Sequence, residues 1–165
     1  MTISANQLAG MQEILAPIAN GAEAQTRAYV TVSKAITDGG TAGTDALISP
    51  IASFPASEFP NGVKVISASF QPSVAVTGAD ATAKTIAITS LTSAGASSVA
   101  VGSIVTNLAG GNIVANAAAP VTLTAANCIV PVGGTLCATM THAGAGMAIA
   151  SATGPALLTV TVQVL

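Results

Sequence analysis

Charged side chains are unusually scarce in this sequence. Only 6% of its 165 residues are Asp, Glu, Lys or Arg, against about 25% in an average soluble domain. Lys84 is the last charged side chain, and beyond it come only His142 and the terminal carboxylate. A free monomer normally stays soluble through interspersed charges. The neutral surface expected here is better suited to a place where partner molecules cover it.

The sequence also lacks a set of residues that could perform catalysis. General acid–base chemistry needs a positioned pair of titratable groups, and one imidazole cannot build a zinc site. His142 is the single histidine, and the acidic residues lie far apart in sequence: Glu13, Glu23, Asp38, Asp45, Glu58 and Asp80. We therefore expect no enzymatic activity and no cofactor. A calcium ion bound by Asp38 and Asp45, which share a glycine-rich loop, is a minor alternative.

Clustered basic residues and long apolar runs are absent as well. The net charge is −2, the pI is near 5.0, and the basic residues are dispersed: Arg27, Lys34, Lys64 and Lys84. Because a phosphate-binding surface needs clustered Lys and Arg, we expect no nucleic-acid partner. The mean hydropathy is +0.72, yet no stretch approaches the roughly 18 consecutive apolar residues of a spanning helix. We expect no membrane association.

Aromatic residues are rare, with no Trp, one Tyr and three Phe. An outer-membrane barrel needs aromatic girdles, and carbohydrate recognition usually uses exposed aromatic rings, so both functions are disfavoured. The segment from Met1 to Asn6 shows neither the basic nor the apolar part of a secretion signal. We therefore expect the protein to be made and kept in the cytoplasm, or released by lysis.

The two cysteines, Cys128 and Cys137, flank residues 129–136 and fit no metal or redox motif. If this segment is a hairpin, the two thiols could face each other across its strands. The main interpretation is a pair of small buried thiols. The alternative is a disulfide formed after release into an oxidising medium.

The N-terminal third of the chain mixes different patterns. Apolar residues from Leu8 to Ile18 recur at helical spacing and predict a helix over residues 1–22. Residues 28–36 are rich in β-branched side chains and predict a strand. Residues 48–61 contain three prolines, which favours an extended connector closed by a turn at Asn61-Gly62.

A regular strand pattern begins after this connector. We therefore predict an N-terminal arm of residues 1–60 and a β-domain of residues 61–165. Short strands with Gly and Pro turns between them are typical of an antiparallel sandwich or barrel, an all-β fold. The candidate strands cover residues 63–70, 84–91, 98–108, 113–117, 121–130, 135–141, 147–150 and 157–165.

Period-two alternation predicts which side chains share a face of each strand. In the last strand, the shared face holds Leu158, Val160, Val162 and Val164. Another strand places Lys84, Ile86 and Ile88 together. In the first strand of the β-domain, strict alternation puts Val63, Val65 and Ser67 opposite Lys64, Ile66, Ala68 and Phe70.

The pattern Thr-x-Thr occurs three times, at residues 122–124, 139–141 and 159–161. Flat arrays of threonine occur in ice-binding proteins. Thr is also the commonest polar choice on the solvent face of a strand. Because the three instances follow no fixed repeat, the second interpretation is favoured.

Several turn and strand motifs follow Gly62 in a definite order. They are Val65 to Pro72, the turn Thr77-Gly78-Ala79-Asp80, the strand Thr85-Ile86-Ala87-Ile88, the segment from Val130 to Leu136, the turn from Thr141 to Ile149 and the closing strand from Leu157 to Leu165. In this order they resemble a family of small jelly-roll proteins from tailed bacteriophages. The resemblance covers residues 62–165. Gly134 departs from the family, which often has Asp there.

This resemblance implies an antiparallel jelly-roll β-sandwich that works as a capsid decoration (cement) or head-fibre protein. Such proteins are often trimeric and bind the major capsid protein on the outside of an assembled shell. The resemblance thus implies a structural virion protein and a homo-oligomer, with a trimer favoured. Alternatives are a fibre, tail or minor shell protein, or a non-catalytic adhesin or glycan-binding module.

The arm is the expected shell contact, because it holds most of the charges and the irregularly placed prolines. Ile51, Phe54 and Phe59 are candidate apolar anchors in it, since buried apolar and aromatic side chains contribute most interface energy. The alternative is that these three side chains cover the base of the sandwich.

Overall fold

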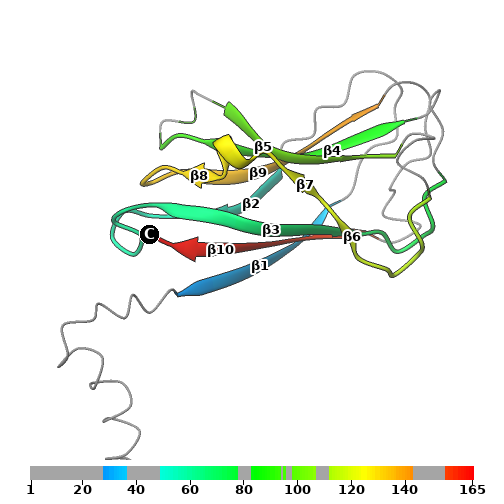
Figure 1. Cartoon of the computed structure of the whole chain (residues 1–165), viewed down its shortest axis with the longest axis horizontal. Coiled ribbons are helices and arrows are strands. Elements are labelled where there is room, and N and C mark those ends of the chain that lie inside the picture. The colour runs from blue at the N-terminus through cyan, green and yellow to red at the C-terminus, as the bar shows by residue number, and fades with distance from the viewer. Residues whose placement is uncertain are drawn as a thin grey trace, which may run out of the picture.

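The computed structural model describes residues 28–36, 49–77, 83–93, 95, 98–106, 112–142 and 155–165. The expected helix over residues 1–22, the loop with Asp38 and Asp45, and the strand expected at 147–150 lie outside these residues. Ten short strands and one turn of 3-10 helix, η2, make up the described part (Figure 1). They are β1 (Tyr29–Ile36), β2 (Ser49–Ser53), β3 (Val63–Gln71), β4 (Lys84–Leu91), β5 (Ser98–Val105), β6 (Ala119–Pro120), β7 (Thr122–Leu123), η2 (Ala125–Asn127), β8 (Ile129–Val130), β9 (Thr135–His142) and β10 (Ala156–Val164).

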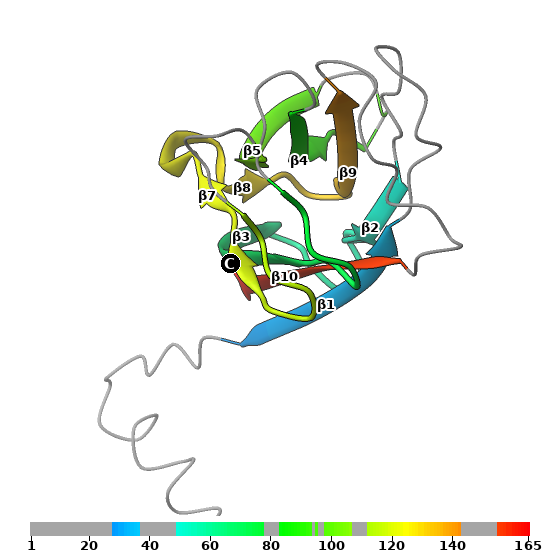
Figure 2. The same cartoon turned by 90° about the vertical axis from the view of Figure 1, so that its right-hand side faces the viewer.

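The strands form two antiparallel sheets that face each other as a sandwich (Figures 1 and 2). Sheet A has the order β1-β10-β3-β6, with β8 also paired to β3, and sheet B has the order β2-β9-β4-β5-β7. Most connections cross from one sheet to the other. When β6 to β8 are counted as one broken strand, the order is that of a jelly roll, with eight strands in two interlocked sheets. The predicted fold class, an all-β antiparallel sandwich, is confirmed.

The core lies between the sheets and consists almost entirely of aliphatic side chains. In β4 buried and half-buried residues alternate along the whole strand, with Lys84, Ile86, Ile88 and Ser90 inside. In β10 the inward residues are Ala156, Leu158, Val160 and Val162. The shared faces predicted for these two strands are therefore confirmed, with Val164 only half buried. A period of two is what a strand with one face on the core must show.

The first strand of the β-domain departs from strict alternation. Val63 and Val65 are buried, but so are Ala68 and Phe70, which alternation placed on the opposite face. The register explains the difference, because Thr161 lies opposite Ser67 while Val162 lies opposite Val65. Ile66 is therefore an extra residue in a β-bulge, which shifts the alternation by one. It is exposed, and the residues after it return to the core side.

The expected boundary at residue 60 does not separate an arm from the sandwich. The strand β1 pairs with β10 over its whole length, and β2 pairs with β9. Both strands precede residue 60, so the described part of the expected arm supplies one strand to each sheet. The prediction of a connector over residues 48–61 rested on their prolines and is wrong for residues 49–53, because an edge strand tolerates proline. Pro50 lies in the edge strand β2, beside an irregularity in the pairing with β9.

Residues 113–130 are more broken than predicted. Ile113 makes an isolated bridge with Val76, and the single strand expected over 121–130 is divided into β7, η2 and β8. The reason is a change of sheet, since β7 pairs with β5 in sheet B and β8 pairs with β3 in sheet A. The turn at Asn61-Gly62 is confirmed. Gly62 has a φ of +78°, and a Cβ on it would lie 2.4 Å from Val130 O.

Leu157 and Leu158 offer a matched test of this architecture. They are neighbours in β10, with Leu158 fully buried and Leu157 38% exposed. We expect Leu158→Ala to lower the free energy of unfolding by about 2–5 kcal/mol, because it leaves a cavity in the core. Leu157→Ala should cost less than about 1 kcal/mol. Urea unfolding of both variants measures the difference. Equal losses would contradict the assigned faces.

Candidate interaction surfaces

The outer face of sheet A is covered by hydroxyl groups. Thr31 and Ser33 of β1 lie opposite Thr161 and Thr159 of β10, which in turn lie opposite Ser67 and Ser69 of β3. Thr31 and Thr161 share a hydrogen bond with an Oγ1–Oγ1 distance of 3.1 Å, and Ser33 Oγ lies 2.9 Å from Thr159 Oγ1. We call this array the hydroxyl face. Its four hydroxyls on β1 and β10 already bond to one another across the strands, so a partner can cover these pairs at a low desolvation cost.

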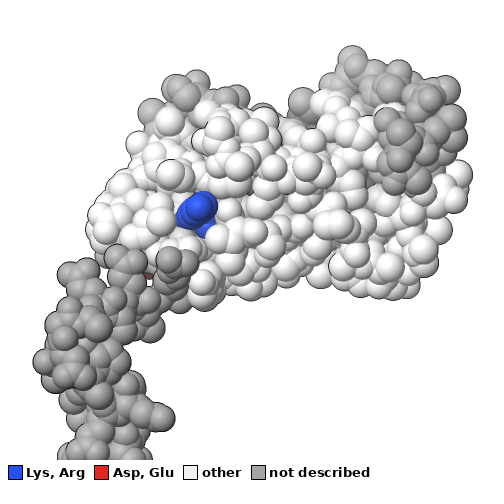
Figure 3. All heavy atoms as spheres, viewed as in Figure 1, with Lys and Arg blue, Asp and Glu red and all other residues white. Residues whose placement is uncertain are grey.

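Charge is sparse over the described surface. Within the described residues the charged side chains are Lys34, Glu58, Lys64 and Lys84, and the last of these is buried between the sheets. The backbone of Lys84 is held by Thr106, whose N–H donates to Lys84 O at 2.9 Å. In Figure 3, basic atoms gather at one place, and the other described atoms on this side are almost entirely uncharged. Long-range steering of a charged partner is therefore not built into these sheets.

The Thr-x-Thr segments do not form one array. Thr159 and Thr161 belong to the hydroxyl face, whereas Thr139 and Thr141 lie on β9 in sheet B. The third segment, residues 122–124, begins with β7 at the edge of sheet B and ends just after it. The interpretation as solvent-facing strand residues is confirmed for these positions, which are half buried or exposed.

The edges of the sheets are protected against pairing with other chains. In sheet A the long edge strand is β1, where Lys34 lies opposite the fully buried Leu158. Since opposed residues share a face, Lys34 lies on the inward side of an edge strand, although its side chain is exposed. An inward-pointing charge is a common defence against edge-to-edge aggregation. Pro50 in β2 has the same effect at the edge of sheet B.

The three candidate anchors are not free surface groups. Ile51 and Phe54 are buried in the core between the sheets, with 7% and 2% exposure. Phe59 packs edge to face against Phe54, with 5.2 Å between the ring centroids. Neither Ile51 nor Phe54 is available to a partner in this conformation. The alternative interpretation holds, because these side chains close one part of the sandwich core.

The two cysteines are free and buried, as the main interpretation predicted. Cys128 precedes β8 in sheet A, and its Sγ donates to Thr124 O at 3.3 Å. Cys137 lies on β9 in sheet B, opposite Pro50 and Thr89. The intervening segment is thus a connection between sheets and not a hairpin, so the thiols are not cross-strand neighbours. Burial raises the pKa of the Cys137 thiol.

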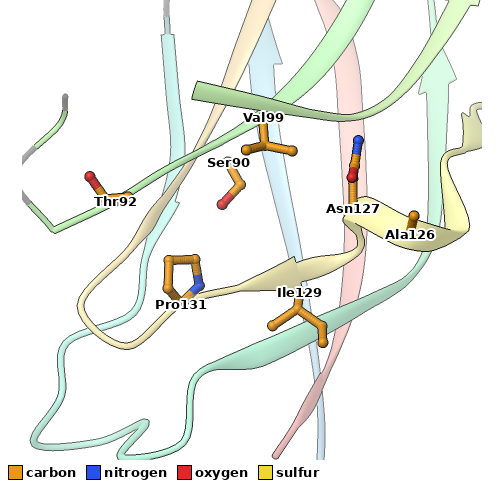
Figure 4. Close-up of a pocket in the computed structure, with 7 residues that line it drawn as sticks. All are labelled: Ser90, Thr92, Val99, Ala126, Asn127, Ile129 and Pro131. Carbon is orange, nitrogen blue, oxygen red and sulfur yellow. The ribbon is translucent and has the colours of Figure 1, made fainter. Parts of the chain in front are cut away.

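A pocket opens where β5 of sheet B faces β8 of sheet A (Figure 4). Its volume is about 260 Å³. Aliphatic atoms of Val99, Ala126, Ile129 and Pro131 line it, together with polar groups of Ser90 and Asn127. Asn127 Nδ2 donates to Ala100 O at 3.0 Å, which ties the turn η2 to β5. Sequence reasoning missed this pocket, because its residues come from three separate stretches of the chain that no motif connects.

The described part of the chain contains no group of three or more His, Cys, Asp or Glu side chains that could hold a metal ion. None of its helices has the length and apolar character needed to cross a membrane. Asp38 and Asp45 lie outside it, so the calcium alternative stays a prediction.

Comparisons with known proteins add no relative. No protein-family profile matches the chain, and no curated protein sequence matches it significantly. The class that the geometry defines is a β-sandwich whose described outer surfaces carry few charges.

Lys34 should limit self-association through the edge of sheet A. We expect Lys34→Thr to increase the fraction of oligomers and aggregates, because it removes the inward charge from β1. Lys64→Thr is the matched control, since Lys64 is an exposed lysine in the interior strand β3. Light scattering of both variants against the parent chain measures the effect. An equal increase in both variants would attribute it to the loss of any exposed lysine and contradict the role of the edge position.

The Cys137 thiol should make stability depend on alkaline pH. Its pKa in the folded state is raised above the ordinary value of 9.0. The folded state therefore holds the proton more tightly than the unfolded chain, and the free energy of unfolding falls as the pH rises past about 9. We expect Cys137→Ala to lose less stability than the parent between about pH 8 and pH 10. Urea unfolding of the parent and the variant at both pH values measures how much the free energy of unfolding falls in each. An equal fall in both proteins would contradict the prediction.

Proposed function

We propose that this protein is a structural component of a tailed-phage virion that decorates and stabilises the capsid by binding across subunits of the major capsid protein. The observation that carries the proposal is the hydroxyl face of a jelly-roll sandwich whose edges are closed to further strands. Such a molecule is built to be covered on its faces. The sequence adds that the chain has one histidine and six acidic residues that lie far apart along it, a composition that disfavours catalysis.

The energetics of covering support the same proposal. Burying an unpaired charge is far more costly than burying a hydroxyl that keeps a hydrogen bond. On the hydroxyl face the Thr31–Thr161 and Ser33–Thr159 hydrogen bonds persist when water is excluded. A partner could therefore occlude an area of about 800 Å² per side, which is normal for a specific interface. When an oligomer of the protein binds several capsid subunits at once, the modest affinities of the single contacts combine into a much higher overall affinity.

Self-assembly is the second part of the proposal. A protein with few charges has little electrostatic repulsion to keep its monomers apart. Among soluble oligomers, closed cyclic assemblies are the rule. We propose a homotrimer as the form that binds the shell, on its exterior. A fibre, tail or minor shell protein of the same virion is the second candidate, and it would use the same neutral surfaces.

The test uses the full chain and purified capsids assembled from the major capsid protein of the phage that encodes it. We expect the chain to sediment with intact capsids, to saturate at a fixed ratio, and to raise the temperature at which the capsids break. Light scattering should give the mass of three chains of 15.8 kDa each. Unassembled capsid protein is the control, because a decoration protein that bridges subunits binds it more weakly. Absence of sedimentation with capsids would overturn decoration, and a monomer would overturn the trimer.

A further inference from the structure

The pocket between β5 and β8 contains a buried hydroxyl group that has no hydrogen-bond partner in the described part of the chain. Ser90 lies on the inward side of β4 and is only 4% exposed. Its Oγ has no hydrogen-bond partner among the described residues. Figure 4 shows this hydroxyl pointing into the space between Val99, Pro131 and Ile129. Because an unsatisfied buried polar group costs stability, its position is best explained by a group that enters the pocket from outside.

The pocket is preformed. Thr124 N–H donates to Val101 O at 2.7 Å, and Asn127 N–H donates to Thr124 O at 2.8 Å. With the bond from Asn127 Nδ2 to Ala100 O, these contacts hold η2 against the edge of β5. The amide group of Asn127 is thereby fixed, and its Oδ1 has no donor among the described residues. A ligand would therefore meet two oriented polar groups without a conformational change.

The lining selects an uncharged and aliphatic occupant. It contains no charged residue and no aromatic ring. Its rim exposes two aliphatic side chains, since Val99 is 44% and Ile129 is 60% exposed. Apolar groups that converge around a few placed polar atoms are typical of binding pockets. A volume of about 260 Å³ lies just below the range of pockets for drug-sized ligands, about 300–1,000 Å³.

We propose that this pocket docks one aliphatic side chain from an uncharged, extended segment of a partner protein. The N–H group of that segment donates to Ser90 Oγ or Asn127 Oδ1, and its side chain packs against Val99, Ile129 and Pro131. The charge match supports a neutral segment, because a charged one would lose its hydration without gaining a counter-charge. The absence of an aromatic ring from the lining disfavours a sugar. Under the proposed function, on which this identification of the partner rests, the segment belongs to the capsid subunit.

The first experiment tests the pocket without any capsid. The isotope-labelled full chain is titrated with N-acetyl-L-valine methylamide, followed by amide chemical shifts. We expect saturable shifts that centre on Ser90, Val99, Asn127 and Ile129, with a dissociation constant in the millimolar range. N-acetylglycine methylamide, which lacks the side chain, should shift them at least about tenfold more weakly. Equal effects of both compounds, or no effect of either, would overturn the proposal. Shifts caused by methyl glucoside instead would assign the pocket to a sugar and also overturn it.

Two variants separate binding from folding. Ser90→Ala removes the unpartnered hydroxyl, so it should leave the folded protein as stable as before or more stable. The same variant should weaken binding of the valine compound several-fold, a combination that a merely structural serine would not give. Val99→Asp should abolish binding, and Val114→Asp is its matched control, since Val114 is a 67% exposed valine that does not line the pocket. Full binding by Ser90→Ala and Val99→Asp would overturn the proposal.

Sedimentation with capsids then identifies the partner. If the parent chain binds capsids and Val99→Asp does not, while Val114→Asp still does, the docked segment belongs to the capsid. If the parent chain binds no capsid, the proposed function fails. The titration with the valine compound then still decides whether the pocket docks a polypeptide. If Val99→Asp binds capsids as well as the parent, decoration stands and the capsid segment is excluded from the pocket.

Discussion

The pairing of β10 with both β1 and β3 is the constraint on which the rest of the structure depends. It brings residues 156–164 between residues 29–36 and 63–71. The inward side chains of β10, among them Leu158 and Val160, supply the middle of the core, and its outward threonines supply the middle of the hydroxyl face. The strand β10 thus contributes both to the buried core, which stabilises the fold, and to the hydroxyl face. Without it, β1 would have no partner in sheet A, and its residues would present an unpaired edge.

The edges of the two sheets explain how a protein with so little charge avoids aggregation. A sheet with neutral faces and open edges would be expected to aggregate. Here Lys34 and Pro50 occupy the long outer strands, while the opposite edges consist of two-residue strands. The faces are left as the available surfaces. The pocket beside β8 is the exception, since it presents aliphatic groups and the buried hydroxyl of Ser90.

Sequence patterns predicted the regular strands well and the irregular ones poorly. The alternation in β4 and β10 identified both their extent and their inward faces, because a half-buried strand must alternate. The bulge at Ile66 could not be predicted, because it depends on the register between β3 and β10, which lie far apart in sequence. Pro50 was taken as evidence against a strand, and only its place at a sheet edge makes it acceptable. Phe54 was expected at a surface contact, yet the fold buries it.

The sequence by itself determined the all-β class and the small number of charged side chains. These follow from composition and short-range periodicity, which are properties of neighbouring residues. Only the tertiary structure decided that residues 29–36 and 49–53 belong to the sandwich, that Cys128 and Cys137 lie in different sheets, and that Ser90 meets Ile129 at a pocket. Each of these facts depends on contacts between distant segments. Local patterns do not specify such contacts, because several sheet orders can bury the same apolar faces.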